Sequence, residues 1–177
     1  HQANTDVETE RALAAEMGNA QTVSDLLAET DEERLAQWLG RGFFEWERDG
    51  YPYWSALHHG KTFWRHRDEG NILFLHYADL KADLAGEMRK IAAHLEININ
   101  EAVFPSLVEA ASFASMKAQA GALVPGADAK LWKSNAQFFA KGKNGQWQDR
   151  WSAENIARFE ALCATYPQDY IDWLLHT

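Results

Sequence analysis

Residues 71–77, Asn-Ile-Leu-Phe-Leu-His-Tyr, constrain the fold of this chain more than any other stretch. The apolar run lies between Gly70 and Asp79, and its length and continuity are typical of a buried strand in a parallel sheet. No other segment predicts a strand as clearly. Because a single strand leaves both of its edges unpaired, a sheet needs neighbours. The run therefore predicts an α/β fold whose other strands are either weaker in sequence or lie outside this chain.

Most of the remaining chain predicts helices. Thr30, followed by three acidic residues, marks a helix start, and apolar residues recur at helical spacing from there to Asp49-Gly50. Similar patterns follow Pro52, and Ser152 begins the last one. Residues 80–95 predict an amphipathic helix, and shorter ones are expected over 101–110 and from Ser112. Four tryptophans recur near helical spacing and are interpreted as core residues: Trp38, Trp46, Trp54 and Trp64.

Composition excludes several classes of protein. A chain of 177 residues with 46% hydrophobic residues and eight tryptophans is long and apolar enough to form one folded domain over 1–177. The weak periodicity of residues 1–30 leaves their order open. No apolar run approaches the roughly 20 residues that span a bilayer, and no signal peptide is visible, so no membrane partner is expected. Cys163 is the only cysteine, which excludes an internal disulfide and favours a reducing, cytoplasmic location.

Residues 138–147, Phe-Phe-Ala-Lys-Gly-Lys-Asn-Gly-Gln-Trp, combine two lysines and two glycines. Glycine lets backbone N–H groups approach an anion closely, and lysine adds a compact positive charge. The net charge is −9, yet residues 117–147 hold five lysines and one aspartate. This distribution favours a small polyanion such as a phosphate over nucleic acid, although a solvated lysine-rich loop is an equally good interpretation.

Other candidate sites are weaker. His58, His59 and His66 lie close together in sequence, but no cysteine or acid completes a set at metal-ligand spacing, so no metal site is expected. The sequence contains no complete P-loop motif. Tyr77 follows the predicted strand, where α/β sheets bind ligands, and its ring could contact a purine base or simply close the core.

Four ordered motifs together resemble the C-terminal half of the PAPS-dependent sulfotransferases of the cytosolic type, and the bacterial branch is the most similar. The resemblance covers about residues 43–177 and rests on these segments: 71–81, 86–92, 112–117 and 141–147. It implies a P-loop-type three-layer α/β fold, of which this chain carries the mostly helical C-terminal part with one clear strand.

The resemblance also implies a binding site for PAPS (3′-phosphoadenosine 5′-phosphosulfate) and its product PAP. By analogy with the family, Tyr77 contacts the adenine. The residues expected beside the adenosine are Ser112, Phe113 and Met116. The family's Phe-x-Arg-Lys-Gly segment, which binds the 3′-phosphate, corresponds here to residues 138–142, including Phe139, Lys141 and Gly142.

One member of this phosphate segment departs from the family pattern. Ala140 replaces the arginine, and losing a bidentate guanidinium should cost about 1–3 kcal/mol of phosphate affinity unless Lys143 or Lys133 compensates. His59 falls near the position where the family lines its acceptor pocket.

The resemblance implies transfer of a sulfuryl group from PAPS to a hydroxyl or amine of a small-molecule acceptor, without a metal. The family's phosphosulfate loop and catalytic histidine belong to the N-terminal half, so no catalytic residue is assigned here. We expect that half to be the partner of this chain, and the chain alone to be inactive. Two alternatives remain open: a non-catalytic nucleotide- or partner-binding module, and a purely helical interaction domain.

Overall fold

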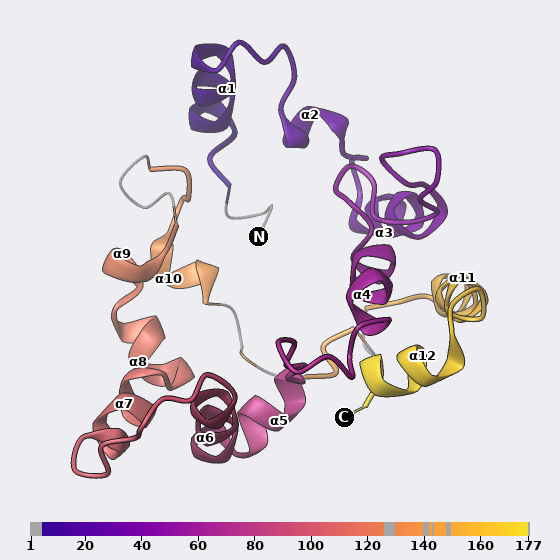
Figure 1. The fold of residues 1–177 in the computed structure, drawn as a ribbon. Helices are drawn as coiled ribbons and strands as arrows, with labels where there is room; N and C mark the ends of the chain where they lie inside the picture. The colour runs from indigo at the N-terminus through magenta and orange to yellow at the C-terminus, as the bar shows by residue number, and fades with distance from the viewer. Residues whose placement is uncertain (1–4, 126–129, 140–141, 143, 148–149, 177) are drawn as a thin grey trace. The chain divides into compact units, whose positions relative to one another are not determined.

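A computed structural model describes residues 5–125, 130–139, 142, 144–147 and 150–176. The described chain consists of helices joined by loops (Figure 1). It divides into two compact units, residues 1–26 with 84–143 and residues 27–83 with 144–177, which we call unit 1 and unit 2. Unit 1 contains α1 (Val7–Glu16), α2 (Val23–Leu26), α6 (Leu84–His94), α7 (Phe104–Ala110), α8 (Phe113–Ala118), α9 (Ala120–Leu123) and α10 (Asn135–Phe138). Unit 2 contains α3 (Asp31–Gly40), α4 (Ala56–Trp64), α5 (Tyr77–Ala82), α11 (Ala153–Cys163) and α12 (Gln168–Leu174).

Side-chain caps begin the helices where the sequence predicted them. Thr30 and Glu33 form a capping box at the start of α3, which confirms the helix predicted there. The hydroxyl of Ser152 accepts a hydrogen bond from the Asn155 backbone N–H at the start of α11, and that helix is also confirmed. These local contacts fix helix starts because they satisfy backbone donors that have no partner within the helix.

The core of unit 2 joins helices that are far apart in the sequence. Leu39 of α3, Leu57 of α4 and Leu162 of α11 form one buried cluster, and α3 packs against α11. A second cluster consists of Cys163, Tyr170 and Ile171. The thiol of Cys163 is therefore part of this core.

The strand predicted for residues 71–77 is wrong for the described structure. Residues 72–76 have no regular secondary structure, α5 begins at Tyr77, and the only β-bridge among the described residues joins Thr5 to Trp132. A strand requires backbone hydrogen bonds to a neighbour, and apolarity alone does not supply them. The run instead packs its Phe74 ring 5.4 Å from the ring of Trp64 and 5.2 Å from that of Trp173.

Three predicted helices differ in extent. The first ends at Gly40, before Asp49, because Arg41 has extended backbone angles. Trp46 therefore lies beyond the end of this helix, and Trp54 lies before α4, which begins at Ala56. These two side chains are 66% and 71% exposed, so their prediction as core residues is wrong. Trp38 and Trp64 do pack against the two core clusters. Residues 80–95 form the end of α5 and all of α6, with a break at Asp83.

Among the residues that the structure describes, no helix has the length and apolarity that a bilayer crossing requires. The described parts of residues 1–30 contain two helices, α1 and α2.

Candidate functional site

Unit 1 brings together most of the residues expected beside a nucleotide. Ser112 is the N-cap of α8, and its hydroxyl accepts a hydrogen bond of 3.1 Å from the backbone N–H of Ser115. Phe113 and Met116 lie on the same helix, half-buried. The Ser-Phe-x-x-Met-Lys pattern is therefore a capped helical turn, which holds the phenylalanine at a fixed place relative to the serine.

Gly142 lies directly against Phe113, although 29 positions separate them in the sequence. A Cβ atom built on Gly142 would be 2.9 Å from two atoms of the Phe113 ring. Gly142 also has φ +58°, a left-handed conformation that favours glycine. Both observations require glycine at this position, because any side chain would strain the backbone and displace the ring.

Phe139 completes this group, with its ring centroid 6.1 Å from that of Phe113 in an edge-on arrangement. The predicted residue Lys141 falls outside the described residues. The two described positions on either side of it, Phe139 and Gly142, both meet Phe113. Folding thus brings Phe139 and Gly142, two described residues of the predicted phosphate segment, to Phe113 at the start of α8.

Lys117 is a residue of this region that the sequence did not identify as functional. Its ammonium nitrogen lies 6.0 Å from the centroid of the Phe113 ring. The lysine ends the Ser-Phe-x-x-Met-Lys pattern, so its position in the motif was a signal that could have found it.

Tyr77 belongs to unit 2, where it is the first residue of α5. The preceding residue, His76, caps this helix, since its Nδ1 accepts a hydrogen bond of 3.2 Å from the Ala78 backbone N–H. Its Nε2 lies 3.1 Å from the backbone carbonyl of Leu174, at the end of α12. The two contacts together fit the neutral tautomer with its proton on Nε2. His76 therefore attaches the start of α5 to α12.

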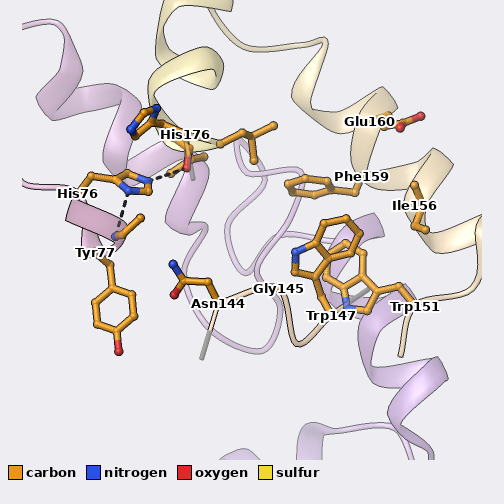
Figure 2. Close-up of a pocket in the computed structure, with 13 residues that line it drawn as sticks. His76, Tyr77, Asn144, Gly145, Trp147, Trp151, Ile156, Phe159, Glu160 and His176 are labelled. Atoms are coloured by element: carbon orange, nitrogen blue, oxygen red, sulfur yellow. Dashed lines mark hydrogen bonds between the residues drawn. The ribbon is translucent and has the colours of Figure 1, made fainter. Parts of the chain in front are cut away.

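A pocket of about 520 Å³ opens beside Tyr77 within unit 2. Figure 2 shows His76, Tyr77 and Asn144 on one side of it and the rings of Trp147, Trp151 and Phe159 on the other. Tyr77 is 56% exposed, so its ring is accessible to a ligand. Apolar walls with a few polar groups at the edge are typical of small-molecule sites.

The aromatic wall of this pocket was not predicted from the sequence. The ring of Trp151 lies 5.5 Å from those of Trp147 and Phe159. Trp147 ends the lysine-glycine segment, which places it in a candidate site. Phe159 belongs to the helical pattern that begins at Ser152, which indicates only a core, and Trp151 precedes that pattern. Their exposure to a pocket depends on how α11 and the preceding loop fold together.

His59 lies on α4 and lines a second pocket of about 500 Å³ in unit 2. The other lining residues come from the loop before this helix and its first turn: Pro52, Tyr53, Trp54, Ser55 and Ala56. The pocket is shallow, and its largest side chain, Trp54, is mostly exposed.

A buried carboxyl group fixes the loop that carries this second pocket. The Asp49 side chain is fully buried, and its Oδ1 accepts hydrogen bonds from the hydroxyls of Ser55 (2.6 Å) and Tyr166 (3.2 Å). Ser55 in turn caps α4. Burial, assisted by the nearby Asp49 carboxylate, raises the pKa of the Tyr166 phenol to about 12. Tyr166 therefore remains a neutral hydrogen-bond donor over the physiological pH range.

Within the described ranges, no group of histidine, cysteine or acidic side chains is arranged to hold a metal ion. The three histidines considered from the sequence, His58, His59 and His66, do not form such a set there.

Comparison with known proteins decides the family. The sulfotransferase domain family matches residues 18–172. The chain belongs to the sulfotransferase domain family.

Individual sulfotransferases are similar over part of their length. A glycolipid sulfotransferase of Mycobacterium tuberculosis is 31% identical over 120 residues, which are 67% of this chain and 37% of that protein. The luciferin sulfotransferase of Photinus pyralis is 32% identical over 113 residues, or 61% of this chain and 30% of that protein. The chain thus spans less than half the length of these relatives.

A solved sulfotransferase structure is likewise similar over only part of its length. Mouse sulfotransferase SULT7A1, crystallised in complex with PAP, superposes with a TM-score of 0.52 at 25% sequence identity. The superposition covers 64% of this chain and 41% of the mouse chain. The described helices therefore match part of a sulfotransferase fold.

Proposed function

We propose that this chain is part of a PAPS-dependent sulfotransferase, which transfers a sulfuryl group from PAPS to a hydroxyl or amine of a small-molecule acceptor. The observation that carries the proposal is the contact of Gly142 with Phe113. It joins the two motifs expected to bind adenosine and the 3′-phosphate, and family membership gives that contact a functional meaning.

We propose the following nucleotide-binding roles for individual residues of each unit. Tyr77, at the edge of the pocket of about 520 Å³, contacts the adenine. In unit 1 Phe113 offers a ring face, and Ser112 and Met116 lie beside the adenosine. Lys141 supplies a positive charge to the 3′-phosphate. Gly142 lets the backbone come close to the same phosphate, since a glycine admits close approach of an anion.

The acceptor is proposed to bind near His59, in the second pocket. One relative is named a glycolipid sulfotransferase and another a luciferin sulfotransferase, so acceptors differ within the family. The proposal for this chain is limited to a small molecule with a free hydroxyl or amine.

The groups that perform the transfer are proposed to lie in a further N-terminal part of the same P-loop-type three-layer fold. Transfer requires a base for the acceptor and cationic or N–H donors for the leaving phosphate. No residue of this chain is assigned to those roles. A cytoplasmic location and a bacterial origin complete the proposal; the single cysteine supports the former and the mycobacterial relatives support the latter.

The test uses two nucleotides that differ only in the 3′-phosphate, PAP and 5′-AMP, with binding to the 177-residue chain measured by calorimetry. We expect PAP to bind at least tenfold more tightly, because each 1.4 kcal/mol of phosphate interaction changes affinity tenfold. Equal affinities would contradict a 3′-phosphate site in this chain.

The same preparation, incubated with labelled PAPS and a panel of phenols, alcohols and amines, should show no transfer above background. Turnover would contradict the proposal that the catalytic groups lie elsewhere.

A further inference from the structure

Helix α5 begins with a cap of a different chemical kind from the others. The other side-chain caps that the structure describes come from hydroxyls or a carboxylate: Asp6, Thr30, Ser55, Ser112 and Ser152. The cap of α5 is the imidazole of His76, which is not among the residue types preferred at this position. A hydroxyl accepts a hydrogen bond at any physiological pH, and a carboxylate does so until the pH is acidic. A neutral imidazole has one acceptor nitrogen and loses it on protonation.

Both ring nitrogens of His76 have partners, and Figure 2 draws the two contacts. Nδ1 accepts a hydrogen bond of 3.2 Å from the Ala78 backbone N–H, and Nε2 lies 3.1 Å from the Leu174 carbonyl oxygen. In the charged ring both nitrogens carry a proton, so Nδ1 would direct an N–H group at the N–H of Ala78. Protonation of His76 therefore keeps the contact with Leu174 and removes the cap of α5.

The charged groups around this half-buried ring come from three helices. Beyond the end of α12, the ring of His176 lies 5.7 Å from that of His76, and its Nε2 lies 3.6 Å from the Oδ1 atom of Asp79 in α5. Glu160 of α11 lines the same pocket and lies across it from His76 (Figure 2). A proton on His176 would strengthen its contact with Asp79 and repel a charged His76. Protonation of the two histidines therefore has opposite effects on the start of α5.

The cap of α5 also determines the position of Tyr77. This tyrosine is the first residue of α5, and it lines the pocket of about 520 Å³ together with His76 and Ala78. α5 has only six residues, and a helix this short is not stable by itself, so its first turn depends on the cap. Loss of the cap would let the first turn open and the Tyr77 ring leave the edge of the pocket.

We propose that His76 is a pH-sensitive positioning residue, whose neutral ring holds Tyr77 at the edge of the unit 2 pocket and whose protonation weakens ligand binding there. The inference rests on the proposed function for the identity of the ligand, an adenine base. The cap itself involves only described residues of unit 2. Binding is therefore strongest when His76 is neutral and falls as the pH decreases, within the range of about pH 5–8 over which histidines ordinarily change charge.

The first experiment needs no ligand. NMR follows the amide signal of Ala78 in the 177-residue chain between about pH 8 and about pH 5. We expect the signal to shift as the cap is lost, and to stay constant in His76→Asn, because asparagine is a preferred cap that does not titrate. An equal shift in His76→Asn would overturn the proposal.

The second experiment measures adenosine binding by NMR titration at about pH 8 and about pH 5.5. Adenosine is the probe because it has no phosphate, whose own charge changes near pH 6. The wild-type affinity should fall about fivefold at the lower pH, the effect of one lost cap. The affinity of His76→Asn should not depend on pH. His76→Gln keeps a donor for Leu174 but has no acceptor at the Nδ1 position, so it should bind weakly at both pH values.

His176→Asn is the matched control, because it removes the neighbouring histidine without touching the cap. The pH dependence of adenosine binding should remain in this variant, and its disappearance there would assign the effect to His176 and overturn the proposal. Circular dichroism checks that each variant is folded.

The outcomes distinguish the role of His76 from the proposed function. If adenosine binds with the same pH dependence in the wild type and in His76→Asn, only the role of His76 is wrong. If His76→Asn and His76→Gln both weaken binding equally and keep the wild-type pH dependence, the histidine is merely structural and the proposal is again wrong. If adenosine binds at neither pH while the Ala78 signal titrates only in the wild type, the adenine role of Tyr77 fails and the pH-sensitive cap is supported.

Discussion

Unit 2 and unit 1 use their apolar residues differently. In unit 2 two buried clusters connect α3, α4, α11 and α12, and aromatic rings surround them. In the described part of unit 1 the buried apolar residues Phe104, Ala120 and Val124 belong to no comparable cluster. The rings of Phe113 and Phe139 in unit 1 remain half-buried.

This difference distinguishes residues that pack in a core from residues that can contact a ligand. A fully buried side chain is covered by other protein atoms, whereas a half-buried ring keeps a face that a ligand can cover. Unit 2 holds the stabilising core, and unit 1 holds most of the predicted nucleotide residues. Tyr77 is the exception, since it lies in unit 2 and is exposed.

The prediction with the largest expected effect tests how much the core of unit 2 contributes to the stability of the fold. Tyr170 is 1% exposed, and its ring lies 5.8 Å from that of Trp64. Tyr170→Ala should lower the free energy of unfolding by about 3–5 kcal/mol, because a large buried ring leaves a cavity. Urea denaturation measures the loss.

Tyr53→Ala is the control, because this ring is 50% exposed, and its cost should be much smaller. Hydrogen exchange should rise in α11 and α12 of Tyr170→Ala and change less in α6 and α7. An equal rise in both units would contradict their separation into two stabilising regions.

A smaller effect concerns the conformation of the phosphate segment in unit 1. Gly142→Ala places a Cβ against Phe113 in a left-handed backbone, which costs about 1–2 kcal/mol from the backbone alone. We expect PAP affinity to fall roughly tenfold, because the segment would leave Phe113. Calorimetry with PAP measures it.

Gly121→Ala provides the comparison within the same unit. Gly121 lies in α9, and a Cβ there would meet no atom within 4 Å. Alanine should leave PAP binding unchanged and stabilise the helix slightly, since alanine has the higher helix propensity. If Gly142→Ala binds PAP as well as Gly121→Ala does, the left-handed glycine is not part of the site.

An effect confined to alkaline pH concerns the tyrosines, all five of which lie in unit 2. Burial raises the pKa of Tyr166 to about 12, above the value near 10 of an unfolded tyrosine. The folded state therefore holds the phenol proton more tightly, and the stabilisation is complete below pH 10. It is lost as the pH rises from 10 to about 12.

Tyr166→Phe should flatten this alkaline loss, as measured by urea denaturation over that pH range. Part of the slope should remain, because burial also raises the pKa of Tyr170. A slope identical to that of the wild type would show that Tyr166 does not contribute.

The sequence predicted local features well where a short-range interaction decides them. The caps at Thr30 and Ser152 lie where predicted, because a cap depends only on residues within one helical turn. The prediction of a strand at residues 71–77 was wrong, because pairing depends on a neighbouring segment. Likewise Trp46 and Trp54 have helical spacing in the sequence, but α3 ends before Trp46 and α4 begins after Trp54.

The sequence by itself determined the family resemblance and the identities of the residues expected to bind the nucleotide, because those motifs consist of neighbouring residues. Only the tertiary structure decided that Gly142 lies against Phe113, that Lys117 is close to the same ring, and that Trp151 and Phe159 line a pocket. The physical reason is that contacts between distant segments depend on how helices pack, and helical periodicity does not specify the partner of an apolar face.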